Sequence, residues 1–492
     1  METPIAEASC CCLPFRGGRR PLPWPDDLCE EKLERAALRA TRFLCRERLE
    51  VGLMSPDTFQ FSILDGIPRS LKNEVLSLAA LDTRATRAMG AMVGMAVADS
   101  VGAFLEFVPI GTKGSRFNPE TLKVEGAFNK FRLKPGQWTD DTSMALCMAD
   151  SLLVHEGYNG ADIRLRFWNW WHRGYNNAFR RDRSRRASVG LGGNIAVSLK
   201  DIDGSPSPRF ESQSEDAGNG SIMRLAPVPI FFSHSCEQAA HYSEESSRTT
   251  HPGKMAAAAC HFLGFFLSKA IRRGPGASGR AAEFLNQVIE EYFDYPWSMA
   301  INRKLVRLLR SAAHGREQCW NWRDPSGPFL EETLEARGSS YNGYPVSPNY
   351  VGSFCLDGLA IAMHSFYHTS SFMEALTRCV NFLGDADSTG AICGQMAGAF
   401  YGLTAIDPRL QRRLRRWDCD EVAFRAALLY ASGRGQRHSE PKEEMPTLLD
   451  RVTKMEDPKV VPDLPFDSLP PRAVTVESEG PSGTEPCHRC QL

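Results

Sequence analysis

Apolar residues recur every three to four positions through most of the middle of the chain, which is the periodicity of amphipathic and buried α-helices. The pattern predicts helices over 85–105, 140–155, 161–177, 236–248, 253–272, 281–293, 299–313, 352–367, 371–382, 389–402 and 420–432. Alternation typical of strands is found mainly in LKVEGAFNKFRL (122–133), where it predicts a short hairpin. The expected fold class is therefore all-α, a multi-helix bundle with at most short strands.

Two of these helices carry small residues at a regular spacing of four. The stripes consist of Gly90, Gly94, Ala98 and Gly102 in the first helix and of Gly390, Gly394, Gly398 and Gly402 in the second. Glycine inside a helix costs about 1 kcal/mol relative to alanine, and close approach of another backbone can offset that cost. Dimerising membrane spans use such stripes too, but both runs are short and Asp99 and Glu106 interrupt the first. We expect the two helices to pack tightly at the centre of the bundle.

Both ends of the chain differ in composition from the middle. Residues 1–84 combine Pro- and Arg-rich pieces with one amphipathic segment, EEKLERAALRATRFLCRERLEV, so we predict a partly helical N-terminal extension. From 434 to 492, Pro, Ser and Glu dominate, and this composition buries too little apolar surface to order itself. We predict a disordered tail there and one large domain over 85–433.

Composition and charge argue against nucleic acid and anionic membranes as partners. The 492 residues carry a net charge of −1, so no overall field attracts nucleic acid or an anionic membrane, and we expect neither as a partner. No apolar run reaches the roughly 18 residues of a spanning helix, and 255–267 is interpreted as a buried helix. Fifteen cysteines without a regular framework indicate reduced thiols. We expect a monomer in the cytoplasm, with a nuclear location left open.

Paired acids stand at two of the predicted helix beginnings. In WTDDTSMAL, Thr139 occupies an N-cap position, and Asp140 and Asp141 fall in the first turn. In GDADSTGAICG, Asp385 and Asp387 precede two hydroxyl residues and a helix of small residues. The simple explanation is that each acid stabilises a helix beginning, where the dipole and the free N–H groups favour negative charge.

The repetition of this arrangement favours a second explanation. If the two helix beginnings converge, four carboxylates crowd one place and need cations to stay ionised. Ligands that are all oxygen suit Mg²⁺ or Mn²⁺ rather than zinc. The four acids, with Thr139 and Ser388 or Thr389, provide enough ligands for a two-metal centre. We therefore predict two Mg²⁺ or Mn²⁺ ions as cofactors.

These blocks resemble the ADP-ribosylglycohydrolase family, the group that includes dinitrogenase reductase-activating glycohydrolase. The resemblance spans roughly 85–433 and rests on five blocks in the family's order: GAMVGMAVADSVGAFLEF, WTDDTSMAL, GNGSIMRLAPV, THPGKMAAAA and FLGDADSTGAICGQMAGAFYG. It implies an orthogonal helix bundle with a binuclear magnesium or manganese site. The implied metal ligands are Thr139, Asp140, Asp141, Asp385, Asp387 and Ser388.

The resemblance also implies roles for residues that the pattern alone leaves open. It implies catalytic roles for Glu106, Asp141 and Asp387, and substrate contacts for Gly218, Asn219, Gly220, Ser221 and His251. Without the resemblance, the sequence favours the simpler interpretations, a helix-end acid that faces solvent for Glu106 and a structural or loop residue for His251. The GNGS turn offers free backbone N–H groups to a phosphate, but Asn-Gly is also simply a good turn.

The expected reaction is metal-dependent hydrolysis of the C1″ glycosidic bond that joins ADP-ribose to a protein side chain or a small molecule. The metals would hold the ribose hydroxyls and activate water, and a cluster acid or Glu106 would move protons. The acceptor stays open between arginine, serine and small ADP-ribose derivatives. The alternatives are a non-catalytic ADP-ribose-binding or structural member and a metal-dependent phosphohydrolase, although the second often uses His ligands that are missing beside these acids.

Overall fold

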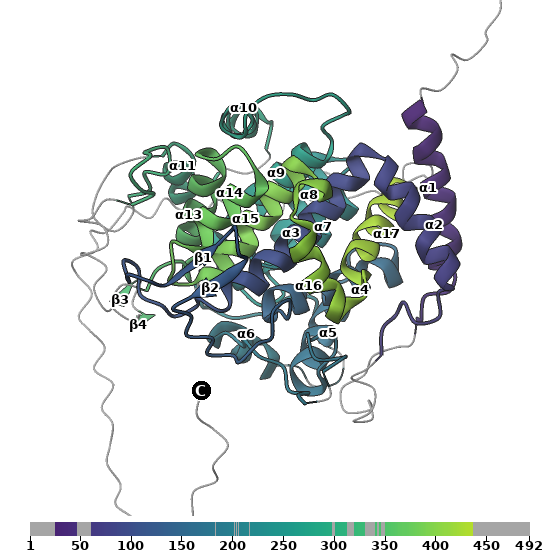
Figure 1. Ribbon diagram of the computed structural model, residues 1–492, viewed down its shortest axis with the longest axis horizontal. Coiled ribbons are helices and arrows are strands. Elements are labelled where there is room, and N and C mark those ends of the chain that lie inside the picture. The colour runs from purple at the N-terminus through teal and green to yellow at the C-terminus, as the bar shows by residue number, and fades with distance from the viewer. Residues whose placement is uncertain are drawn as a thin grey trace, which may run out of the picture. The chain divides into compact units, whose positions relative to one another are not determined.

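The computed structural model describes residues 25–46 and 61–435, apart from 183, 201, 203, 205, 216, 298–300, 312–318, 330–339, 342–343 and 346–349. Within these residues the fold is all-α, with two short two-stranded sheets, as the sequence predicts. Figure 1 shows the helices packed around α3 and α15.

Helices α3 (Thr83–Gly102) and α15 (Ala386–Tyr401) pack along the two stripes of small residues. A Cβ atom added to Gly94 would lie 2.4 Å from the carbonyl oxygen of Gly394, and one added to Gly398 would lie 2.0 Å from that of Gly90. The prediction of two tightly packed central helices is confirmed. This close packing brings the C-terminal end of α3 beside the beginning of α15.

Further helices cover this central pair. α13 (Cys355–Tyr367) and α14 (Phe372–Val380) pack on α15, and α9 (Lys254–Ile271) packs on α8 (Cys236–Ser247) and on α15. Among the described helices, α9 alone has the length and composition of a membrane span, but 72% of its apolar window is buried inside the fold. The interpretation of 255–267 as a buried helix therefore agrees with the structure.

The remaining helices complete the bundle. They are α4 (Asp140–His155), α5 (Gly160–Arg173), α6 (Gly193–Lys200), α7 (Pro227–Phe231), α10 (Ala281–Asp294), α11 (Arg303–Leu309), α16 (Pro408–Asp418) and the short 3-10 turns Asn219–Ser221 and Leu403–Ala405. A second hairpin pairs β3 (Ser340–Tyr341) with β4 (Tyr344–Pro345). Most predicted helices are present, with ends that differ by a few residues.

The predicted hairpin exists but begins earlier in the chain. Strand β1 (Arg116–Asn118) pairs antiparallel with β2 (Lys123–Glu125), whereas the sequence pattern placed the hairpin over 122–133. Phe117 is held through both its N–H and its carbonyl by the side-chain amide of Asn381 (2.6 and 3.0 Å), a partner 264 residues away. Residues 126–133 do not continue the sheet, because Gly126, Asn129 and Arg132 have positive φ angles that turn the chain.

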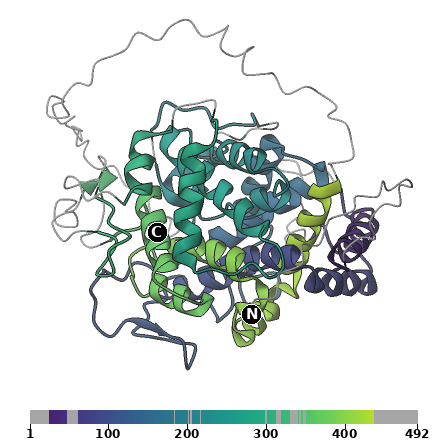
Figure 2. The same ribbon diagram turned by 90° about the horizontal axis from the view of Figure 1, so that it is seen from above.

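Two helices of the N-terminal extension pack against the last described helix. α1 (Pro25–Thr41) and α2 (Arg69–Leu81) lie side by side and contact α17 (Glu421–Gly435), as Figures 1 and 2 show. One face of α1 is buried, with the apolar side chains of Leu33, Ala36, Ala37 and Ala40, whereas Leu38 on the other face is exposed. The predicted tail from 434 lies almost wholly outside the described residues, so the division at 84 and 434 stays a prediction.

Candidate active site

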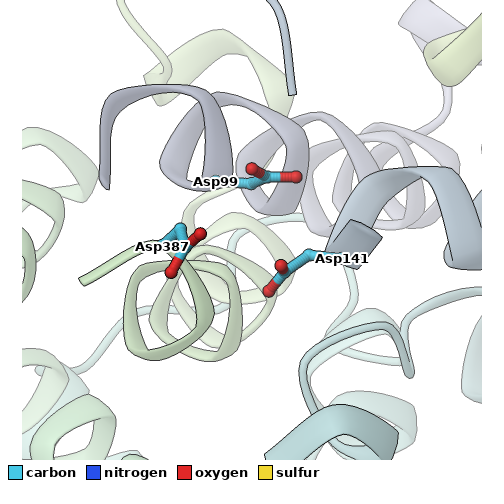
Figure 3. Close-up of side chains that lie close together, drawn as sticks. All are labelled: Asp99, Asp141 and Asp387. Carbon is cyan, nitrogen blue, oxygen red and sulfur yellow. The ribbon is translucent and has the colours of Figure 1, made fainter. Parts of the chain in front are cut away.

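The beginnings of α4 and α15 meet beside the C-terminal half of α3. Carboxylate oxygens of Asp99, Asp141 and Asp387 lie within 4.8 Å of one another, and Figure 3 shows these three side chains converging from three helices. A second group with the same spacing contains Glu106, Asp385 and Asp387. Asp387 belongs to both groups and joins them. The acidic pairs that the sequence predicts to converge therefore do so in the structure.

The beginning of α4 is fixed by Asp99 of α3. Thr139 is the N-cap residue, as predicted, but its hydroxyl makes no capping bond and donates to Asp99 (2.8 Å) and Asp141 (3.0 Å) instead. The N–H groups of Thr139 and Thr142 also donate to Asp99 (3.0 and 3.1 Å), and so does the Thr142 hydroxyl (2.6 Å). Both oxygens of Asp99 are thus used to hold the acidic helix beginning.

Sequence reasoning did not assign Asp99 to the site. In the sequence it appears only as an acid that interrupts a stripe of small residues. The position of Asp99 could have indicated a role in the site, because a carboxylate inside a fully packed helix needs several hydrogen-bond donors to offset its lost hydration.

The beginning of α15 is positioned by the segment that carries Glu106. Phe107 donates its N–H to the carbonyl of Gly384 (3.0 Å), and Gly384 returns a bond to the carbonyl of Val108 (2.8 Å). Gly384 has φ +70°, and a Cβ there would lie 2.4 Å from the carbonyl oxygen of Val351, so the tight turn before Asp385 requires glycine. This bridge fixes Glu106 next to Asp385 and Asp387.

Asp385 has two side-chain partners outside its own helix. The Asn219 amide donates to Asp385 (2.9 Å) and to the carbonyl of Gly352 (3.0 Å). The Tyr350 hydroxyl also hydrogen-bonds to Asp385, and its ring stacks on Phe107 with 5.7 Å between centroids. Tyr350 is a site residue that sequence reasoning missed, since nothing near it in the sequence marks it.

Asp140 stands apart from the two three-acid groups and is covered by a glycine. A Cβ atom added to Gly190 would lie 2.0 Å from Oδ1 of Asp140, and Gly190 has φ +90°. Only glycine allows the loop to approach this carboxylate. Burial, followed by repulsion from Asp387 and Asp99, raises the pKa of Asp140 well above its ordinary value.

Within the described residues, the negative charge of this cluster is poorly compensated: Arg224 acts on Asp140 at a distance, but the acids mainly repel one another. Burial is the main cause that raises the pKa values of Glu106, Asp141 and Asp387, and repulsion among the acids adds to it. In the described part of the chain no Lys or Arg side chain forms a salt bridge with any acid of the cluster. Oδ1 of Asp141 and Oε2 of Glu106 are buried without a hydrogen-bond partner. Such a set of oxygens could hold a hard divalent cation.

The GNGS turn lies against this cluster, but only some of its side chains face the acids. Asn219, Gly220 and Ser221 form a buried 3-10 turn, anchored by the bond from the Asn219 N–H to the carbonyl of Ser353 (2.8 Å). The Ser221 hydroxyl lies in the core, where it accepts from Ser247 (2.9 Å). Gly218 forms an isolated antiparallel β-bridge with Phe354, the N-cap residue of α13.

His251 lies beside this turn and inside the fold. A Cβ added to Gly220 would lie 2.9 Å from its ring, and Nδ1 is 2.8 Å from the Thr250 hydroxyl. Burial, followed by the positive charge of Arg224, lowers the pKa of His251 to about 3. The imidazole is therefore neutral at physiological pH.

Ser388 is also near the acids. Its N–H donates to Asp387 (2.9 Å), and its hydroxyl hydrogen-bonds to Asp385 and lies 3.5 Å from the sulfur of Met223. The six residues expected as ligands, together with Glu106 and Asn219, thus lie in or next to one buried acidic region.

Comparison with known proteins identifies the relatives of this chain. The family model described as ADP-ribosylglycohydrolase matches residues 80–438. The ADP-ribosylarginine hydrolase Tri1 of Serratia proteamaculans is 30% identical over 65% of this chain and 73% of its own length. The ADP-ribosyl-[dinitrogen reductase] glycohydrolase of Rhodospirillum rubrum is 26% identical over 67% of this chain and 93% of its own length.

A solved structure is similar as well. A chain of an ADP-ribosylglycohydrolase-related protein complex superposes with a TM-score of 0.52 at 28% identity, over 71% of this chain and 99% of that chain. With the family model, these relatives and this fold in agreement, the chain belongs to the ADP-ribosylglycohydrolase family of hydrolases.

Proposed function

We propose that this chain is a divalent-cation-dependent hydrolase that cleaves the C1″ glycosidic bond between ADP-ribose and an acceptor side chain. The observation that carries the proposal is the meeting of six buried acids from four chain segments, none of which forms a salt bridge with a described Lys or Arg side chain. An uncompensated cluster of this kind is costly unless a cation or a set of protons neutralises it.

The proposed ligands are Thr139, Asp140, Asp141, Asp385, Asp387 and Ser388, and the proposed ions are Mg²⁺ or Mn²⁺. A divalent cation bound there supplies Lewis-acid stabilisation and a more acidic water. Asp99 acts differently, because both its oxygens already accept bonds from Thr139 and Thr142. We assign Asp99 the role of a positioning residue that orients the first turn of α4.

Glu106 is the proposed proton carrier. Its carboxyl hydrogen-bonds to Asp387, and burial together with that neighbour raises the pKa of Glu106 well above its ordinary value. An acid that keeps its proton near neutral pH can deliver it to a leaving group, and the resulting carboxylate can later accept one. The unpaired Oε2 of Glu106 is the atom available for this transfer.

Arginine is the acceptor side chain that we propose. Two relatives at 30% identity, from Serratia proteamaculans and Pseudomonas putida, are named ADP-ribosylarginine hydrolases. The human relative named ADP-ribosylhydrolase ARH3 is more distant, at 22% identity.

The test uses two peptides, one ADP-ribosylated on arginine and one on serine, each with Mg²⁺ and with excess chelator. We expect ADP-ribose release from the arginine-linked peptide, lost on chelation and restored by added Mg²⁺. Release from neither peptide, with tight binding of free ADP-ribose, would replace the proposal with a non-catalytic binding protein. Release that persists in chelator would remove the metal from the mechanism.

A further inference from the structure

The imidazole of His251 is held on one side by a hydroxyl and a guanidinium. Nδ1 of His251 lies 2.8 Å from Oγ1 of Thr250, and the same Oγ1 accepts a hydrogen bond from Nη2 of Arg224 (2.6 Å). All three side chains are buried. These contacts form one chain of hydrogen bonds that runs from Arg224 through Thr250 to the histidine ring beside the GNGS turn.

The chemistry of these groups fixes the direction of each hydrogen bond. A guanidinium has only donors, and although burial lowers the pKa of Arg224 to about 10, the group stays charged at neutral pH. The Thr250 hydroxyl therefore accepts from Arg224 and keeps its single hydrogen for another acceptor. In the described part of the chain, the only acceptor that this hydroxyl reaches is Nδ1 of His251. Nδ1 is thus an acceptor that carries no hydrogen.

The other ring nitrogen of His251 must then carry the hydrogen. The ring is neutral at pH 7, because burial and the charge of Arg224 lower the pKa of His251 to about 3. A neutral imidazole has one N–H, so an accepting Nδ1 leaves that hydrogen on Nε2. Nε2 has no hydrogen-bond partner among the described residues. Since buried donors are normally paired, a bound molecule or water has to supply its acceptor.

The Nε2 edge of the ring lies against the backbone of the GNGS turn. A Cβ atom added to Gly220 would lie 2.9 Å from Cε1 and 3.3 Å from Nε2 of His251, so the absence of a side chain at Gly220 allows this approach. Ser247 holds the two segments together. Its hydroxyl donates to that of Ser221 (2.9 Å), and its carbonyl accepts from the N–H of His251 (2.8 Å). The donor is therefore fixed relative to the turn.

We propose that Thr250 and Arg224 are positioning residues that hold His251 as its Nε2–H tautomer, so that the ring donates a hydrogen bond to an oxygen of ADP-ribose bound beside the GNGS turn. In this arrangement Nε2 of His251 is neither a general base nor a metal ligand, because both roles need a lone pair on that atom. The identity of the ligand rests on the proposed function, whereas the tautomer rests on the hydrogen bonds alone.

The tautomer is measured by NMR on the full-length protein without any ligand. In protein labelled with ¹⁵N-histidine, the ring signals of His251 are those that are missing from the spectrum of His251→Gln. At pH 7 we expect Nδ1 to show the chemical shift of a nitrogen without a hydrogen and Nε2 that of a protonated nitrogen. A hydrogen on Nδ1, or on both nitrogens, would overturn the proposal.

Thr250→Val keeps the shape of the side chain and removes its hydroxyl. We expect the Nδ1 signal of His251 to move to the shift of a nitrogen that accepts no hydrogen bond, and the affinity for free ADP-ribose, measured by calorimetry, to fall at least about tenfold. Thr250→Ser, which keeps a hydroxyl, should restore both. An Nδ1 signal that does not move in Thr250→Val would contradict the positioning role.

Thr249→Val is the matched control. The Thr249 hydroxyl is also buried and accepts from Arg224 (3.3 Å), but it does not bond to the imidazole. This variant should leave both the Nδ1 signal and the ADP-ribose affinity unchanged. Equal effects of Thr249→Val and Thr250→Val would reduce the role of Thr250 to general packing and would overturn the proposal.

Arg224→Met tests the far end of the chain of hydrogen bonds. Without the guanidinium, the Thr250 oxygen is free to accept from Nδ1, so we expect a second population of His251 with its hydrogen on Nδ1. A spectrum without this population, together with unchanged ADP-ribose affinity, would remove Arg224 from the arrangement.

Two substitutions of the ring test the donor itself. The amide nitrogen of Gln can take the place of Nε2, whereas that of Asn can take only the place of Nδ1. We expect His251→Asn to bind ADP-ribose at least about tenfold more weakly than His251→Gln, and equal affinities would remove the donor role. Wild-type protein that shows the expected ring signals but binds no ADP-ribose would overturn the proposed function and the ligand named here. Binding with the hydrogen on Nδ1 would overturn the positioning alone.

Discussion

The N–H and the hydroxyl of Thr139 both donate hydrogen bonds to the carboxylate of Asp99, 40 residues earlier, at 3.0 and 2.8 Å. The bond pair couples the central helix α3 to the first turn of α4, where Asp140 and Asp141 stand. The position of these two proposed metal ligands therefore depends on Asp99, to which we assign a positioning role and no contact with substrate. Packing of α3 on α15 extends the same dependence to Asp387, so one helix pair sets the geometry of the whole cluster.

Asp99→Asn should separate positioning from ligation. The asparagine side chain has one acceptor oxygen where aspartate has two, and its NH2 group would face the donors of Thr139 or Thr142. The lost hydrogen bonds should lower the free energy of unfolding by about 1–3 kcal/mol. The Mg²⁺ concentration needed for half-maximal stabilisation should rise at the same time. Urea unfolding with and without Mg²⁺ measures both. Asp407→Asn, which changes an N-cap acid of α16, is the control and should leave the Mg²⁺ dependence unchanged.

Asp387→Asn should abolish turnover without unfolding the protein. Asp387 belongs to both three-acid groups, so its loss removes a shared ligand while relieving repulsion among the remaining carboxylates. We expect turnover to fall by orders of magnitude, the heat of Mg²⁺ binding to vanish and the melting temperature without metal to stay the same or rise. Activity assays, calorimetry and thermal melts check these outcomes. A variant with wild-type rates would remove Asp387 from the mechanism.

Gly190→Ala should weaken cation binding, although Gly190 lies outside both acidic motifs. Its methyl group would meet Oδ1 of Asp140, so either the loop or the carboxylate must move. We expect Mg²⁺ affinity, measured by calorimetry, to fall at least about tenfold. Gly111→Ala is the matched control, since Gly111 also has a positive φ (+78°) and no atom lies within 4 Å of the added Cβ. Equal affinity in the two variants would contradict the role of this loop.

His251 should make stability depend on pH on the acidic side. Its folded pKa is about 3, against an ordinary value of 6.5, so the unfolded chain binds more protons in this window. The stability contributed by the neutral ring is fully present above 6.5 and is lost progressively as pH falls toward 3. At pH 5 the loss from this residue is about 2 kcal/mol. Urea unfolding of wild type and His251→Gln at pH 7 and 5 should show a smaller drop in the variant.

Gly94→Ala should damage the packing of α3 on α15. The new methyl group would lie 2.4 Å from a backbone carbonyl of α15, and backbone cannot yield as a flexible side chain does. We expect a loss of about 1–3 kcal/mol or more in the free energy of unfolding. In Gly193→Ala, at the beginning of α6, no atom lies within 4 Å of the added Cβ, and stability should be kept or improved. Equal melting temperatures for the two variants would argue against close packing of the stripes.

Much of the fold and part of the site could be predicted from local patterns. Helical periodicity located the helices, the stripes of small residues predicted the α3–α15 contact, and the paired acids predicted the cluster. Predictions that needed a distant partner were less complete. The hairpin was placed too late because Asn381 holds Phe117, and Tyr350 was missed because its link to Asp385 exists only after folding.

The order of residues along the chain already contains the periodicity, the glycine spacing and the acids at two helix beginnings, because each of these is a property of neighbours within a few turns. Folding over long distances settles which atoms meet: Asp99 with Thr139, Asn219 with Asp385, Gly190 with Asp140, and the Ser221 hydroxyl with the core instead of the acids. These pairings depend on how closely helices approach and on which face each side chain takes, and both follow from the packing of the complete bundle.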